Sequence, residues 1–437
     1  MLQSIGNVFR IPELRTRILF TLALLAIFRV GTYIPTPGID SQQLAQAMAG
    51  NFEGVFGFLD MFSGGAFSQL TIFALGIMPY ISASIILQLL AVVVPYLERL
   101  AKEGDAGRKK ITQYTRYGTV VLSVIQSFGI AIGLEGMQGG SLVLNGGGWM
   151  FRLMTVITLT AGTAFLMWLG EQITERGIGN GISLLIFAGI VARLPSAVVR
   201  TLQQVFTNQM KPWTVAIILI VIVVVTAGTV LMQQAQRRIP VQYAKRVVGR
   251  RLMGGSSTHI PLRINTAGVM PVIFASSIIM FPITILKFAA SPDRPWVQWL
   301  FDNFQPGSLI YMVMYIGFTV FFTYFYTAII FNPVDLADNM KKHGGFIPGY
   351  RPGKNTADFI DKTLTRITLV GAIFLSAIAL LPTLLYSWLH VQFYFGGTAL
   401  LIVVGVGLDT VQQIESHLLM RHYEGFMKKG RIRGRRG

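Results

Sequence analysis

Two glycine-rich runs are the residues of this chain that come nearest to a nucleotide-binding loop. Gly349-Tyr-Arg-Pro-Gly-Lys354 ends in a lysine, but its spacing differs from the G-x-x-x-x-G-K-[ST] pattern that cradles phosphates. Gly177-Ile-Gly-Asn-Gly181 likewise lacks the spacing of a dinucleotide-binding loop. No H-E-x-x-H pattern occurs, and no Ser/His/Asp set can be assembled from the sequence. The sequence therefore predicts a protein that is not an enzyme and that uses no metal and no cofactor.

Three acidic residues bear on whether the protein is an ion-coupled carrier. Glu135, Glu171 and Asp409 lie near the ends of long apolar segments, and no such segment has an acid at its centre. Ion-coupled carriers usually place an acid or a histidine in the middle of the membrane. The pattern disfavours a carrier driven by protons or sodium ions, although a ten-span solute carrier built from inverted repeats remains the main alternative.

Long apolar segments dominate the chain. Hydrophobic residues make up 52% of its 437 residues and charged residues 13%, whereas a soluble domain carries about 25% charged residues. The segment from Trp213 to Met232 has twenty residues and no charge. A helix of this length extends for about 30 Å, the thickness of the hydrocarbon core of a bilayer. We therefore expect this segment to span a membrane.

Ten segments share this character. Their predicted ranges are 18–34, 71–94, 114–134, 152–170, 181–199, 213–232, 268–287, 309–331, 367–389 and 397–415. Pro79 lies in the second range, Pro271 and Pro282 in the seventh, and Pro382 in the ninth. A proline inside a spanning helix frees a backbone carbonyl, so we expect these three helices to face protein or a cavity.

The distribution of basic residues predicts the orientation. The formal net charge is +18, and 30 of the 37 Lys and Arg residues lie on one side of the predicted spans, against six on the other. Arg29 lies within the first span. Because cytoplasmic loops collect Lys and Arg, both termini are expected in the cytoplasm. Five spans in each half would give the halves opposite orientations, so an inverted repeat is allowed.

Three regions outside the predicted spans are distinctive. Pro35–Leu70, on the outer side, has no Lys or Arg and contains the apolar stretch Gly54–Gly65, which is too short to span. The loops Gln233–Ala267 and Asn332–Arg366 are long, basic and cytoplasmic. The chain has no cysteine, and its first residues lack a cleavage-site pattern, so we expect neither disulfides nor a removable signal peptide.

Seven motifs resemble, in order along nearly the whole chain, those of the SecY family, the central channel subunits of the prokaryotic Sec protein translocase. They are Arg29-Val-Gly-Thr-Tyr-Ile-Pro-Thr-Pro-Gly-Ile-Asp40, Met61-Phe-Ser-Gly-Gly65, Ala74-Leu-Gly-Ile-Met-Pro-Tyr-Ile-Ser-Ala-Ser84, Gly170-Glu-Gln-Ile-Thr-Glu-Arg-Gly-Ile-Gly-Asn-Gly181, Ser257-Thr-His-Ile-Pro-Leu262, Pro348-Gly-Tyr-Arg-Pro-Gly353 and Phe395-Gly-Gly-Thr398. One departure is Asp60, because the family commonly has Asn before Met-Phe-Ser-Gly-Gly.

The resemblance implies an all-α polytopic membrane protein with ten transmembrane helices in two inverted five-helix halves around a central pore. The first half would be residues 1–200, with a plug at about 54–66, and the second half residues 201–437, with basic loops 233–267 and 332–366 and a basic C-terminal tail. The implied function is a protein-conducting channel that translocates unfolded secretory polypeptides and releases hydrophobic segments sideways into the membrane, driven by an external motor or ribosome. Besides the channel and the solute carrier, a third interpretation is an insertase without an aqueous pore.

The resemblance also implies a narrow ring of apolar side chains in the pore. The matching residues are Ile77, Ile81, Ile182, Ile186, Ile273 and Ile402. Ile77 with Ile81, and Ile182 with Ile186, are i,i+4 pairs, so each pair would lie on one helix face. Isoleucine offers no hydrogen bond, so such a ring would exclude water. The alternative is that these residues simply pack against protein or face lipid.

Two movable parts are implied as well, a plug and a lateral gate. The plug residues are Phe58, Leu59, Asp60, Met61, Phe62, Ser63, Gly64 and Gly65, and the gate residues on spans two and seven are Ser82, Gln88, Asn265 and Phe281. The plug sequence would alternatively form a helix lying on the outer headgroups. Gln88 and Asn265 would hydrogen-bond across the gate, or alternatively cap local backbone.

Basic residues of the cytoplasmic loops match a surface that docks the motor and the ribosome. They are Arg237, Arg238, Lys245, Arg246, Arg250, Arg251 and Arg351. The alternative is that their charge serves only to orient the protein in the membrane. The implied partners are SecE-type and SecG-type small membrane subunits, the SecA ATPase, the ribosome, signal peptides and nascent polypeptides. The tail Lys428–Arg436 would contact RNA or anionic lipids. The expected location is a prokaryotic, bacterial plasma membrane, with multiple passes.

Overall fold

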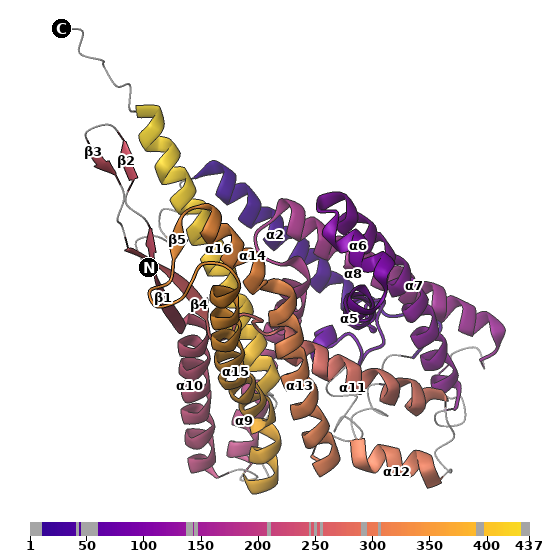
Figure 1. Cartoon of the computed structure of the whole chain (residues 1–437). Coiled ribbons are helices and arrows are strands. Elements are labelled where there is room, and N and C mark those ends of the chain that lie inside the picture. Colours follow the sequence, from indigo (N-terminus) through magenta and orange to yellow (C-terminus); the bar gives the residue numbers. More distant parts are fainter. Residues whose placement is uncertain are drawn as a thin grey trace. The chain divides into compact units, whose positions relative to one another are not determined.

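The structure of the protein is a computed structural model. It describes residues 11–40, 43–44, 60–136, 143, 147–207, 211–243, 246–248, 251–253, 257–289, 295–304, 307–389 and 397–429. The chain forms two compact units. Figure 1 labels its helices and strands. Unit 1 comprises residues 1–202, 280–302 and 406–437, and unit 2 comprises residues 203–279 and 303–405. The predicted division into halves at residue 200 stays a prediction.

Each predicted span corresponds to one long helix. These helices are α2 (Pro12–Gly31), α5 (Met78–Val93), α7 (Asp105–Gly136), α8 (Trp149–Arg176), α9 (Gly181–Phe206), α10 (Pro212–Gln234), α11 (Met270–Ala289), α13 (Leu309–Ile330), α15 (Lys354–Leu389) and α16 (Gly397–Lys429). Within the described ranges, seven helices are long and apolar enough to cross a membrane, and the bent pair of α5 and α6 (Pro95–Lys102) would make an eighth. The two remaining helices, α2 and α11, have 20 residues each.

The surface of helix α10 is the clearest indication that lipid surrounds the protein. It is the helix that covers the uncharged segment Trp213–Met232. Leu219, Val223 and Leu231 are among its large exposed apolar side chains. Exposed isoleucine, leucine and valine at this density have no place in water, so these side chains are matched to hydrocarbon.

Two predicted features of the second and seventh spans are wrong in detail. Helix α5 begins at Met78 and not at residue 71, because residues 71–77 form turns, with Gly76 in the left-handed region at φ 56°. Pro79 and Pro271 are therefore the second residues of α5 and α11. A proline in the first turn interrupts no helical hydrogen bond, so these two free no carbonyl in mid-span. Pro282 does lie inside its helix.

In unit 1, the turns between residues 60 and 77 lie in a core built with α2, α7 and α8. Phe67, Leu70 and Leu75 pack in one cluster with Ile130 of α7 and Leu159 of α8. Phe73 stacks between Phe28 of α2 and Phe165 of α8, with ring centroids 6.1 and 6.0 Å apart. A Cβ atom on Gly162 of α8 would lie only 1.9 Å from the carbonyl oxygen of Ile72. Glycine at this position is what lets the helix approach the turns so closely.

In unit 2, the two basic loops contain strands that the sequence did not predict. Strand β1 (Gln236–Tyr243) pairs antiparallel with β4 (Ser257–Arg263) on one side and with β5 (Gly345–Phe346) on the other. A separate hairpin joins β2 (Arg246–Val248) to β3 (Arg251–Met253). The small sheet packs on α14 (Pro333–Lys342) and α15 through a cluster that includes Ile239, Val241, Leu262, Met340 and Ile360. The helical prediction therefore holds for the spans, and the loops add a sheet.

Candidate functional site

The expected plug is described from Asp60 onwards. Asp60–Ser63 form one helical turn, and Gly64 and Gly65 follow at φ 69° and 94°. These values lie in the left-handed region, where only glycine is free of strain, so the chain reverses there. Phe58 and Leu59 lie outside the described residues. We call residues 60–68 the plug segment.

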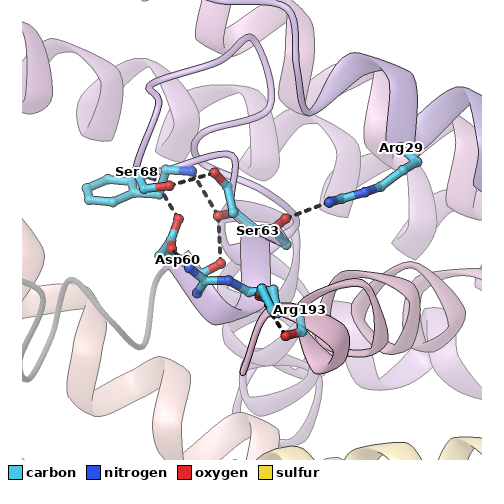
Figure 2. Close-up of polar contacts among 9 residues, drawn as sticks. Arg29, Asp60, Ser63, Ser68 and Arg193 are labelled. Atoms are coloured by element: carbon cyan, nitrogen blue, oxygen red, sulfur yellow. Dashed lines mark hydrogen bonds and ion pairs between the residues drawn. The ribbon is translucent and has the colours of Figure 1, made fainter. Parts of the chain in front are cut away.

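Asp60 is the centre of a polar cluster in the plug segment (Figure 2). Its side chain is 0% exposed. One carboxylate oxygen accepts a hydrogen bond of 2.8 Å from the backbone N–H of Ser68, and the other forms an ion pair with Arg193 of α9. Burial raises the pKa of Asp60, because it disfavours the charged form, while Arg193 and Ser68 act in the opposite direction.

The hydroxyl of Ser63 makes two hydrogen bonds within the turn that begins at Asp60. It donates to the carbonyl oxygen of Asp60 at 3.2 Å and accepts from the backbone N–H of Phe67 at 3.1 Å. The N–H of Gly65 also donates to the Asp60 carbonyl, at 2.9 Å. These bonds give several backbone groups of the plug segment a partner within the segment, as a segment surrounded by protein requires.

Arg29 of α2 contacts the middle of the plug segment. Its guanidinium donates to the carbonyl oxygen of Gly64 at 2.7 Å (Figure 2). It also donates to the hydroxyl of Tyr33 at 2.8 Å. Sequence analysis assigned no role to Arg29 or Arg193. The available signal was that both basic residues lie away from the cytoplasmic loops, where a cation needs a specific partner.

Besides the ion pair with Arg193, the plug segment makes a second contact with α9, and this one is between backbone atoms. A Cβ atom built on Gly64 would lie 2.8 Å from the Cα atom of Gly189, and one on Gly189 would lie 3.2 Å from the nitrogen of Gly64. Real Cβ atoms essentially never approach other atoms to 2.8 Å, and a contact of 3.2 Å is unusually tight, so glycine at both positions permits the close approach. Gly189 lies on the same helix as Arg193, one turn earlier.

The predicted ring residues are described within their own units. In unit 1, Ile77, Ile81 and Ile186 are 5%, 4% and 2% exposed, and Ile182 is half-buried. In unit 2, Ile273 and Ile402 are also buried. Burial alone fits both a pore ring and ordinary packing, so the ring stays a prediction.

The predicted gate residues have local hydrogen-bond partners. The amide of Gln88 donates to the hydroxyl of Ser84 at 3.0 Å, one turn earlier in α5, and the amide of Asn265 donates to the carbonyl of Gly268 at 3.0 Å. These contacts fit the alternative of local capping, although the buried Oδ1 of Asn265 accepts nothing from the described residues. Ser82 is buried on α5, and Phe281 lies on α11 with its side chain outside the described part. The gate stays a prediction.

Glu135 and Glu171 pair with arginines at opposite ends of the α7–α8 helix pair. Glu171 of α8 contacts Arg116 of α7 at 2.7 Å, and Glu135 of α7 contacts Arg152 of α8 at 2.6 Å. Each pair joins two helices that pack side by side. These carboxylates therefore link helices, which is a structural task and not the binding of a transported ion.

The small sheet joins the two basic loops that the sequence treats separately. Arg237 and Arg238 are exposed on β1, and β1 pairs directly with β5 of the second loop. Arg246 lies on β2 and Arg251 on β3, while Lys245 and Arg250 lie outside the described residues. Arg237 and Arg238 thus lie on a sheet that links the two basic loops, which sequence reasoning missed, whereas Arg246 and Arg251 lie on the separate hairpin. The docking role of these residues stays a prediction.

Arg351 is exposed in a short turn between β5 and α15. Its flanks are anchored: Ile347 is 3% exposed, and the ring of Tyr350 lies 4.2 Å from the ring of Phe359, centroid to centroid. The hydroxyl of Thr356 donates to the backbone carbonyl of Arg351 at 2.9 Å. The anchored turn therefore presents the side chain of Arg351 to solvent, and its docking role stays a prediction.

Comparison of the sequence with protein families matches the SecY family model over residues 71–411. Three bacterial relatives, each described as "Protein translocase subunit SecY", align over nearly their full lengths. The protein of Aquifex aeolicus is 48% identical over 98% of this chain and 100% of its own, that of Escherichia coli K12 is 49% identical over 97% and 96%, and that of Streptomyces galbus is 50% identical over 98% and 100%.

Solved structures share the fold at low sequence identity. One, described as "The structure of a protein conducting channel", is 17% identical with a TM-score of 0.63, and covers 92% of this chain and 91% of its own. Another, described as "Sec61 in the Canine ribosome-channel complex from the endoplasmic reticulum", is 16% identical with a TM-score of 0.62 and the same coverage. At this level of identity the likeness concerns the fold.

The close contact between Gly64 and Gly189 yields a prediction about seating of the plug segment. Gly64→Ala adds a Cβ atom against α9 and strains a left-handed residue, at about 1–2 kcal/mol for the strain alone. In a Ser63→Cys background, where Ser63 is 2% exposed, we expect faster maleimide labelling of the cysteine after Gly64→Ala. The chain has no native cysteine to interfere.

Gly104→Ala is the matched control for this experiment. Gly104 has a similar φ of 76°, but a Cβ atom there would meet nothing within 4 Å. Labelling of Ser63→Cys should stay at the parent rate in this variant. Equal labelling after Gly64→Ala and Gly104→Ala would show that the contact with Gly189 does not seat the segment.

Proposed function

Because the chain belongs to the SecY family, we propose that unfolded secretory polypeptides cross a bacterial plasma membrane through it and that hydrophobic segments leave it sideways into the lipid. It is a multi-pass membrane protein and a protein-conducting channel subunit, not an enzyme. The observation that carries the proposal is the full-length similarity to bacterial protein translocase subunits. The predicted ring, plug, gate and docking residues supply the proposed working parts.

The two alternative functions are less well supported. A solute carrier needs an ion or a solute bound at mid-membrane, and Glu135 and Glu171 are engaged in links between helices. An insertase without an aqueous pore would release membrane segments but would not pass soluble chains. Transport of a soluble secreted polypeptide therefore separates the channel from both alternatives.

We propose that the cytoplasmic partners are the ribosome and a SecA-type ATPase, and that SecE-type and SecG-type small subunits complete the complex. The support for docking is the exposure of Arg237 and Arg238 on β1, together with that of Arg351 in its anchored turn. The excess of basic residues on one side of the spans supports an orientation with both termini in the cytoplasm. Signal peptides and nascent polypeptides are the proposed cargo. The basic C-terminal tail would add contacts with RNA or anionic lipids.

The test of the function is transport by the reconstituted complex. The chain is placed in vesicles with the small subunits and a motor ATPase, and a secreted substrate is assayed for protection from protease. We expect ATP-dependent protection by the parent and strongly reduced protection with Arg351→Glu, because the reversed charge opposes the motor at the docking turn. Arg351→Lys keeps the charge and should retain transport in part. Normal transport by Arg351→Glu would reject the docking role, and no transport by the parent would reject the channel.

The proposed ring leads to a prediction about leakage. Replacing Ile81 and Ile186 with Asn should let water and ions through the resting channel, because polar side chains remove the barrier to wetting. The measurement is the resting conductance in planar bilayers. Replacing both residues with Leu keeps the ring apolar and serves as the control, which should stay tight. A conductance unchanged by the Asn pair would show that these residues do not line the pore.

The proposed gate leads to a crosslinking prediction. Ser82→Cys with Phe281→Cys should form a disulfide on oxidation if α5 and α11 are neighbours, because a disulfide needs Cα atoms within about 7 Å. A closed bridge should block transport, and reduction should restore it. The absence of native cysteine leaves this pair as the sole thiols. Failure to crosslink, or full transport while oxidised, would contradict the gate.

A further inference from the structure

The plug segment is held by two arginines from different helices. Arg29 of α2 donates to the backbone carbonyl of Gly64, and Arg193 of α9 pairs with the carboxylate of Asp60 (Figure 2). The two contacts differ in kind. The contact with Gly64 is a hydrogen bond to a neutral carbonyl, whereas the contact with Asp60 neutralises a charge.

The Asp60 carboxylate depends on its partners because it has no access to water. Its side chain is 0% exposed, and within the described residues it contacts Arg193 and the N–H of Ser68. A buried charge without a partner is strongly unfavourable. Removal of Arg193 alone would therefore leave a group that the closed position cannot accommodate as an anion.

Arg193 differs from Asp60 in its exposure. Its side chain is 34% exposed, so the guanidinium keeps contact with solvent while the carboxylate does not. If the plug segment moves away from α9, both charges reach water and are hydrated separately. The pair therefore favours the seated position without making departure prohibitive, since exposed ions recover their hydration.

We propose that the Asp60–Arg193 ion pair is an electrostatic latch that sets how readily the plug segment leaves α9, and that Arg193 is its positioning residue. The inference rests on the proposed channel function. The apolar seat around Phe67 and the Gly64–Gly189 contact shape the closed position. Of these contacts, only the ion pair would be lost on protonation of the Asp60 carboxylate or on a single substitution that removes one charge.

The experiment is a double-mutant cycle on the full complex in planar bilayers. The variants are Asp60→Asn, Arg193→Gln and the two combined, and the measurement is the resting ion conductance. Each single variant should raise the open fraction at least about tenfold, which corresponds to about 1.4 kcal/mol. The combined variant should be no leakier than the single ones, because the same contact is lost only once. Arg193→Lys keeps the charge and should fall between parent and Arg193→Gln.

The control is Glu135→Gln, which breaks another arginine–carboxylate pair, one that does not touch the plug segment. Its conductance should equal that of the parent. The latch is overturned if the single variants conduct like the parent, if their effects multiply in the combined variant, or if Glu135→Gln leaks as much. A parent complex that transports no polypeptide would instead refute the channel function, so the two failures are distinguishable.

Discussion

The hydrocarbon layer offers the backbone no hydrogen-bond partner, and the architecture of this protein follows from that constraint. Ten segments satisfy their backbone groups by forming helices, in which the N–H and C=O groups pair within the segment. The turns of residues 60–77 satisfy their backbone groups in a different way. They are packed among α2, α7 and α8, and their backbone groups find partners nearby: the carbonyl of Leu70 accepts from the N–H of Thr36, and the N–H of Ile72 donates to the carbonyl of Ile34, both at 3.0 Å. Irregular backbone is tolerated at such a place because protein, not lipid, surrounds it.

Charged side chains that are shielded from water also need partners within the protein. The carboxylates of Glu135 and Glu171 are neutralised by arginines on a neighbouring helix, and the pairs lie at the two ends of α7 and α8. Asp60 is the more demanding case because it is buried in a segment expected to move. A charge pair suits a movable contact better than apolar packing does, since each ion has an alternative partner in water when the contact breaks.

The loops that are predicted to face the cytoplasm are free of the constraint, and their structure differs accordingly. Strands are possible there because water satisfies the edges of β4 and β5. The sheet brings the loop of Arg237 and the loop of Arg351 into one body, held by the cluster around Ile239 and Ile360. A folded sheet that carries the exposed Arg237 and Arg238 would be well suited to receive the proposed anionic or acidic partner. Separate flexible loops would first lose conformational entropy on binding.

The sequence by itself determined the number and approximate limits of the spans, because hydrocarbon thickness dictates the length of an apolar helix. It also determined the family, through motifs in a fixed order, and it pointed to Asp60 as a departure from the family pattern. Only the tertiary structure decided what Asp60 contacts. Arg29 and Arg193 are 31 and 133 residues away from it in the chain, and no local periodicity relates them.

The start of α5 and the sheet were likewise decided by the folded chain. Residues 71–77 are as apolar as a helix would be, but their packing against Gly162 and Phe28 holds them in turns. The strands β1 and β5 pair across about a hundred residues of sequence, and a two-residue strand such as β5 has no pattern of its own. Apolar periodicity reports which face a segment buries. Pairing between distant residues depends on where the chain brings them, and that information exists only in three dimensions.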